Sequence, residues 1–285
     1  MTTDEKFAAL ESRIAALENR ISKNLPPETV DEVMATNERI LLNDAQRLAN
    51  SMLMSDKPQF FVAASPFTAV ELDDIFESSS QAVKLFENPV VIREDGFNPN
   101  PGDRRSQIID GRVREVRIGT QARQIFRDGR FIAMFPGDDS FLGWAMKSSG
   151  WPMSSAQENT PWRINSLVLI EATYLSVLLA NSLLKLAKPS GAPIQYSIGL
   201  KNMKYKDQGP LILNGKADRN LHQYPQVQAD FESGVFSLLP VENDKPERVS
   251  FKLVAEIYRR FGIPDDRIPY SEIIDGQRRL VPSAF

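Results

Sequence analysis

An Asp-Gly pair between two runs of alternating residues is the feature that most restricts the fold of this chain. Asp128-Gly129 lies within Gln124-Ile-Phe-Arg-Asp-Gly-Arg-Phe-Ile-Ala133. Asp-Gly in this setting predicts a β-hairpin closed by a two-residue type I′ turn. The chain is therefore expected to contain an antiparallel sheet.

The expected register assigns the hairpin side chains to two faces. Phe126 would lie opposite Phe131, and Arg127 opposite Arg130. One face is then apolar and belongs in a core, with Ala122, Phe126, Phe131, Ala133 and Phe135. The other face carries Arg123, Arg127 and Arg130, interleaved with Ile125, Ile132 and Met134.

Further apolar patterns predict the fold class. Strands are expected at 59–64, 112–119, 194–200, 211–213 and 235–239, and an amphipathic helix at 246–261. This mixture predicts an α+β fold, with an antiparallel or mixed sheet covered by helices. We expect a short coiled-coil helix at 1–25, a helical connector at 26–57, an α+β body at 58–264, and a C-terminal tail or hairpin at 265–285.

The most apolar stretch runs from Ile164 to Leu186 and predicts a long helix, capped by Thr160 and begun by Pro161. A membrane span is not expected, because Glu171 would lie near the bilayer centre, where a carboxylate costs about 2.5 kcal/mol or more. The polar residues fall on one narrow stripe, which is typical of a core helix with one wet edge. They are Arg163, Glu171, Asn181, Ser182 and Lys185.

The N-terminal segment has the spacing of a coiled coil. Its apolar residues follow a 3, 4, 3, 4 pattern: Phe7, Leu10, Ile14, Leu17 and Ile21. Isoleucine at a with leucine at d favours a parallel dimer, and Arg13 at g would face Glu18 of the second copy. Residues 4–24 are thus a candidate for self-association. The alternative is an amphipathic helix docked on its own domain, because three heptads are marginal alone.

Composition excludes several kinds of chemistry. The chain has no cysteine, which excludes disulfides, thiolate metal sites and cysteine nucleophiles. One histidine, His222, cannot form a multi-histidine metal site within one chain. We expect no enzyme activity, no metal and no cofactor. The absence of cysteine and of a signal-peptide pattern is typical of a cytoplasmic protein.

The remaining motifs support no catalytic site. Gly209 and Gly215-Lys216-Ala217 have the wrong spacing for a phosphate-binding loop, and Ala217 stands where a hydroxyl residue is required. Three adjacent acidic pairs are typical of solvated loops: Asp73-Asp74, Asp138-Asp139 and Asp265-Asp266. His222 lies in a polar turn with no evident partner for general-base catalysis.

Arginine is concentrated in one region of a chain whose net charge is −3. The candidate patch for an anion or partner comprises Arg112, Arg114, Arg117, Arg123, Arg127 and Arg130. Guanidinium groups bind phosphates and carboxylates through paired hydrogen bonds. The alternative is that these arginines pair with acids of the same chain and cover the sheet.

Residues 60–262 resemble part of a bacterial family. The matching pieces are Gly96-Phe97-Asn98, Val116-Arg-Ile-Gly119 and Phe126-Arg-Asp-Gly129, followed by a long apolar helix and a strand. They are similar to the region after the Alba-like domain of bacterial Schlafen-type proteins, which are described as DNA-binding. The Alba-like domain has no counterpart here, and the heptad segment takes its place. The resemblance implies a compact α+β module in a cytoplasmic bacterial protein, an accessory or sensing part of a larger system.

Two functions follow as hypotheses. The first is a non-catalytic interaction module that self-associates through its N-terminal helix and recognises a protein partner with its body. The second is nucleic-acid binding through the arginine face. The two hypotheses predict different responses to salt. In duplex DNA binding, the plot of log affinity against log salt concentration has a slope of about −0.9 for each phosphate that the protein neutralises.

Overall fold

A computed structural model describes residues 27–72, 75, 77, 79–92, 97, 106–109, 111–117, 119–144, 161–213, 226–241 and 244–285. It divides the chain into two compact units, Met1–Arg39 and Ile40–Phe285. Helix α2 (Pro27–Ser51) is divided between them, as is the predicted connector at 26–57. The heptad residues Phe7, Leu10, Ile14, Leu17 and Ile21 lie outside the described residues, and their role stays a prediction.

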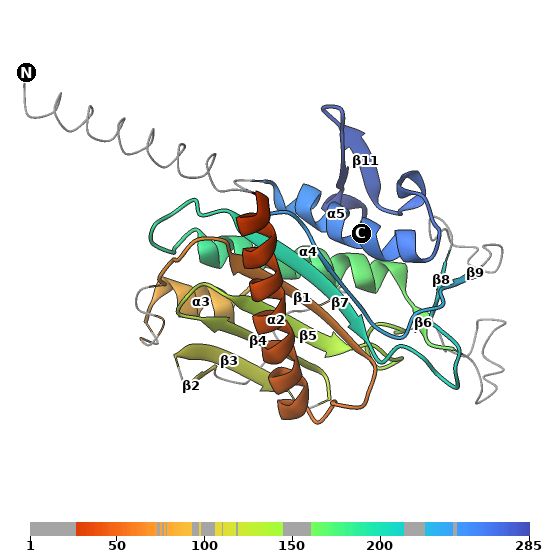
Figure 1. Cartoon of the computed structure of the whole chain (residues 1–285), viewed down its shortest axis with the longest axis horizontal. Coiled ribbons are helices and arrows are strands. Elements are labelled where there is room, and N and C mark those ends of the chain that lie inside the picture. The colour runs from red at the N-terminus through yellow and green to blue at the C-terminus, as the bar shows by residue number, and fades with distance from the viewer. Residues whose placement is uncertain are drawn as a thin grey trace, which may run out of the picture. The chain divides into compact units, whose positions relative to one another are not determined.

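The larger unit is an α+β fold, as the sequence predicts, built on a seven-stranded sheet (Figure 1). The strand order is β10-β7-β1-β5-β4-β3-β2, and every neighbouring pair is antiparallel. The strands are β1 (Gln59–Pro66), β2 (Gln107–Ile109), β3 (Arg112–Arg117), β4 (Gln121–Phe126), β5 (Phe131–Pro136), β7 (Ile194–Lys201) and β10 (Gly234–Ser237). A three-stranded sheet contains β6 (Arg163–Ile164), β8 (Leu211–Leu213) and β9 (Gln226–Gln228).

The central strands β1, β4 and β5 are buried on both faces of the sheet, and β1 shows how. Phe60, Val62 and Ala64 face a core that also contains residues of α3 (Gln81–Glu87), α4 (Ser166–Leu184) and α5 (Pro246–Arg260). Phe61 and Ala63 face a second core with α2 residues from Leu41 onward. Since successive side chains of a strand point to opposite faces, a strand buried on both faces is a continuous apolar run.

The predicted register of the β4–β5 hairpin is wrong by one residue. Ile125, not Phe126, lies opposite Phe131. The Gly129 N–H donates to the Phe126 carbonyl at 3.0 Å, and Gly129 has φ of +79° while Asp128 does not have positive φ. The connection is therefore a three-residue turn with glycine at its left-handed position, and not type I′. A shift of one residue moves side chains to the opposite face.

The second Asp-Gly pair forms the turn expected of the first. β11 (Ser271–Ile274) and β12 (Gln277–Leu280) pair with Ile274 opposite Gln277. Asp275 and Gly276 have φ of +55° and +72°. Two consecutive positive values define a type I′ turn. The predicted C-terminal tail or hairpin at 265–285 is thus a hairpin with short helical turns.

Helix α4 begins later than predicted. Asn165, not Thr160, is its N-cap, and its side-chain oxygen accepts from the Leu167 N–H at 3.0 Å. The preceding residues Arg163 and Ile164 form strand β6, which pairs in parallel with β8. A residue in an extended strand cannot also continue a helix, so the cap moves to the first residue after β6.

The apolar character of α4 reflects burial in the core. By length and composition, the helix could cross a membrane. However, 72% of its most apolar 18-residue stretch is buried inside the structure. Glu171, predicted on a wet edge, is 1% exposed. Asn181 and Lys185, at the C-terminal end, do reach the surface. The core-helix interpretation is confirmed, with its wet edge confined to the last turns.

Candidate functional site

The predicted arginine face is divided between the two sides of the sheet. Arg123 is 5% exposed, and its Nε and Nη2 donate to Glu115 Oε2 at 2.9 and 2.6 Å. Its guanidinium also lies over the ring of Phe86, on α3, at 4.9 Å. Burial lowers the pKa of Arg123, and Glu115 opposes that shift. Arg123 is therefore a buried structural residue.

Three of the other arginines lie on the α2 side of the sheet. Arg130 forms ion pairs with Asp44 of α2 and with Asp128, and its guanidinium lies 4.3 Å from the ring centre of Phe126. Arg112 lies on the same ring at 5.6 Å, and the Arg114 Nη1 donates to the Ser51 hydroxyl at 3.2 Å. Burial raises the pKa of Asp44, against the effect of Arg130.

The remaining patch residues do not join this group. Arg127 lies in the turn and pairs with Glu71, and both side chains are about half exposed. The side chain of Arg117 lies outside the described residues, as does His222. The expectation that Arg123, Arg127 and Arg130 share one face is wrong, because it followed from the incorrect register.

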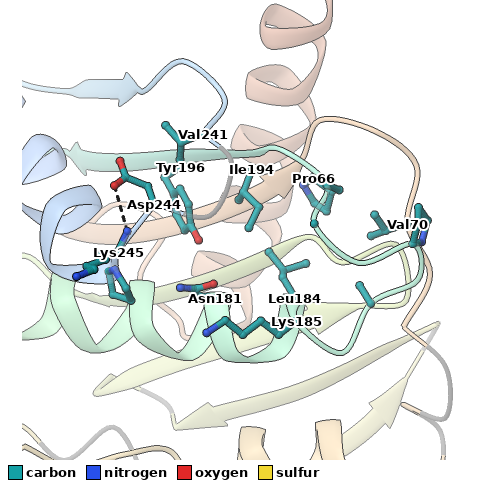
Figure 2. Close-up of a pocket in the computed structure, with 15 residues that line it drawn as sticks. Pro66, Val70, Asn181, Leu184, Lys185, Ile194, Tyr196, Val241, Asp244 and Lys245 are labelled. Carbon is teal, nitrogen blue, oxygen red and sulfur yellow. Dashed lines mark hydrogen bonds between the residues drawn. The ribbon is translucent and has the colours of Figure 1, made fainter. Parts of the chain in front are cut away.

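A pocket elsewhere in the larger unit is the best candidate site. It lies at the C-terminal end of α4, the start of α5 and the first half of β7, and has a volume of about 230 Å³ (Figure 2). Its apolar lining consists of Pro66, Val70, Leu184, Ala187, Pro189, Gly191, Ala192, Ile194, Val241 and Pro246. Its polar lining consists of Asn181, Lys185, Tyr196, Asp244 and Lys245.

The hairpin tip supports one wall of this pocket. A Cβ at Gly129 would lie 2.8 Å from both Leu184 Cδ2 and Val70 Cγ2, so the turn packs directly beneath two lining residues. Backbone bonds join the loop after β1 to the segment after α4. The Glu71 N–H donates to the Lys188 carbonyl at 2.8 Å, and the Lys188 N–H donates to the Glu71 carbonyl at the same distance. The wall is thereby held by three separate parts of the chain.

Tyr196 is the most informative residue in the pocket. The residue is 3% exposed, and it lines the pocket. Burial raises its pKa, and the charge of Asp244 raises it further. Figure 2 shows the hydroxyl directed toward Asn181. A phenol that stays protonated acts as a hydrogen-bond donor and acceptor, not as a base.

The carboxylate of Asp244 already has its partners. It accepts from the Lys245 N–H at 3.1 Å and from Lys252 Nζ at 3.0 Å. Arg248 Nη1 lies 3.4 Å from it. Its side chain is 11% exposed. Asp244 therefore stabilises the start of α5, and most of its acceptor positions are already occupied.

The side chains of this pocket supply a phenol, an amide, a carboxylate, two lysine side chains and apolar walls. Within the described residues, no group of three or more histidine, aspartate or glutamate side chains is placed to hold a metal ion. A neutral donor beside apolar walls can orient a ligand.

Sequence reasoning missed the pocket, although two of its signals were visible. Asn181 and Lys185 belong to the polar stripe of the long helix, and Tyr196 interrupts the aliphatic alternation of Ile194, Ile198 and Leu200. A tyrosine on the buried face of a strand suggests that its hydroxyl meets a polar partner or a cavity. Nothing local indicated that these residues, α5 and the loop after β1 would meet.

Comparison of the chain with protein-family models, with curated proteins and with solved structures finds no match.

Proposed function

We propose that the protein is a non-catalytic binding module that self-associates through residues 4–24 and recognises a partner or ligand at the pocket of its α+β body. The observation that carries the proposal is Tyr196, a residue only 3% exposed whose hydroxyl opens onto the pocket. A bound acceptor that replaces water on this hydroxyl would contribute about 0.5–1.5 kcal/mol.

The cellular setting belongs to the same proposal. A cysteine-free chain that resembles part of a bacterial family supports a cytoplasmic accessory protein, and a protein partner would connect it to a larger system. Nucleic-acid binding is the second candidate. It is favoured by Arg112, Arg114 and Arg130 on one side of the sheet, but the ion pairs of Arg130 already occupy part of that charge.

The pocket can be tested without knowing its natural ligand. We expect a fragment library, screened by ligand-observed NMR, to yield ligands that bind the wild-type chain and not Ala192→Trp, because a large ring at this lining position would fill the cavity. Ala284→Trp is the matched control, since Ala284 is exposed and outside the pocket lining. Identical ligands for the wild type and Ala192→Trp, or none for either, would contradict the proposed site.

Self-association is tested separately. We expect the full chain to sediment as a dimer, and both Ile14→Asp and a chain beginning at Glu28 to sediment as monomers. A charge at an a position destroys the apolar seam of a coiled coil. Lys23→Asp, outside the a and d positions, is the control. Equal masses for the full chain and the shortened chain would show that the segment is not the contact.

A further inference from the structure

We propose, on the basis of the binding function above, that the pocket takes a small organic anion, with an apolar body and one carboxylate group. The inference combines the buried phenol, the charges of the pocket and the apolar walls. Each of these restricts the ligand in a different way.

The Tyr196 hydroxyl offers a hydrogen-bond donor to a ligand in the pocket. The raised pKa of Tyr196 keeps its proton on the hydroxyl. Asp244 is the nearby acceptor that would compete for this proton, but Lys245, Arg248 and Lys252 already engage its oxygens. A ligand carboxylate accepts hydrogen bonds more strongly than a neutral group does.

Two of the three charged side chains in the pocket lining are positive. Lys185 and Lys245 line it, and neither ammonium group forms an ion pair with a described residue. Figure 2 shows the side chain of Lys185 lying beside Asn181. The one carboxylate among the described lining residues, Asp244, pairs with Lys252 and Arg248, which are not in the lining, and its charge still raises the pKa of Tyr196.

The start of α5 adds to this field. Pro246 is in the first turn of the 15-residue helix, and the capping residue Lys245 supplies no side-chain cap bond. The amino end of a helix carries a partial positive charge that stabilises anions. The Asp244 carboxylate accepts a hydrogen bond from the Lys245 N–H and so offsets part of this positive charge. Arg248 and Lys252, both on α5, form ion pairs with Asp244 in turn.

The body of the ligand must be apolar. Most of the lining consists of aliphatic side chains and prolines, among them Val70, Leu184, Ile194 and Val241. Such walls gain free energy by excluding water from a hydrocarbon and offer few partners to a polyhydroxylated molecule. The hydrocarbon part of a short alkyl or aryl acid would pack against these walls, and its carboxylate would accept from the phenol and attract the lysines.

The test uses three probes with one hydrocarbon chain: hexanoate, hexanol and hexylamine. In NMR titrations of the full chain at low salt, we expect hexanoate to bind at least tenfold more tightly than hexylamine. Tyr196→Phe should weaken hexanoate about tenfold, since a hydrogen bond to a charged group is lost. Lys185→Gln should weaken it about threefold, as for an exposed ion pair.

Matched variants show whether these losses belong to the pocket. Tyr174→Phe removes a hydroxyl that bonds to Glu247 outside the pocket lining. Lys84→Gln removes an exposed ammonium in the last turn of another helix, α3. Neither should change hexanoate affinity. Both phenylalanine variants keep their rings, so their folds are expected to persist.

The possible results separate the ligand class from the binding function. Equal or tighter binding of hexanol or hexylamine, with loss in Tyr196→Phe, would overturn the anion assignment and leave the pocket as a binding site. Hexanoate affinity that is unchanged in Tyr196→Phe and Lys185→Gln would also overturn it. If none of the three probes binds, the ligand class is wrong, and the fragment screen with Ala192→Trp decides the binding function independently.

Discussion

Replacing Glu115 with alanine is expected to lower the free energy of unfolding by about 3–5 kcal/mol, because it leaves a buried guanidinium without its counter-charge. Glu115 and Arg123 are 6% and 5% exposed, and two nitrogens of Arg123 donate to one oxygen of Glu115. Arginine remains charged even where burial lowers its pKa. Urea denaturation monitored by circular dichroism measures the loss.

Two control experiments identify the cause. Glu71→Ala removes the acid of the half-exposed Arg127 pair and should cost less than about 1 kcal/mol. The double variant Glu115→Leu with Arg123→Met should recover most of the loss, because well-packed apolar residues replace a buried ion pair at little cost. Similar losses for Glu115→Ala and Glu71→Ala would show that burial does not govern the first pair.

Gly129→Ala is expected to destabilise the protein by about 2–5 kcal/mol, for two additive reasons. The left-handed backbone, with φ of +79°, costs an L-residue about 1–2 kcal/mol. The new methyl would also lie 2.8 Å from Leu184 Cδ2 and Val70 Cγ2, and overpacking of this kind costs about 1–3 kcal/mol. Thermal and urea denaturation of the variant provide the measurement.

Gly276→Ala is the matched control, since it has the same Asp-Gly setting. Its φ of +72° carries the same backbone strain, but its Cβ would meet nothing within 4 Å. We expect a loss of about 1–2 kcal/mol there. Because Leu184 and Val70 line the pocket, Gly129→Ala should also weaken its ligands, whereas Gly276→Ala should not. Equal effects at both glycines would mean that the packing of the first turn is not tight.

These two predictions follow from contacts that local sequence does not specify. The sequence indicated that residues 121–136 form a hairpin, but not that Gly129 at its tip would pack against Leu184 at the far end of α4. Likewise, Glu115 and Arg123 are recognisable as charged residues on neighbouring strands. The burial of Arg123 depends on Phe86 of α3, whose ring packs against its guanidinium group.

The two Asp-Gly pairs show most clearly why register could not be predicted. Both lie between alternating runs, yet Asp275-Gly276 forms a two-residue turn, and Asp128-Gly129 belongs to a three-residue turn. The turn residues permit either geometry. In β4 and β5 the choice is consistent with the burial of both sheet faces, which places Ile125 with Phe131 in one core and Ile132 with Met134 in the other.

The sequence by itself determined the α+β class, the positions of most strands and long helices, and the core role of α4, because these depend on hydrophobic periodicity and turn residues that act over a few positions. Only the tertiary structure decided the hairpin register, the separation of Arg123 from Arg130, and the pocket around Tyr196. Each of these depends on side chains distant in the chain competing for the same space. That competition is settled by packing across the whole fold, and no local pattern records it.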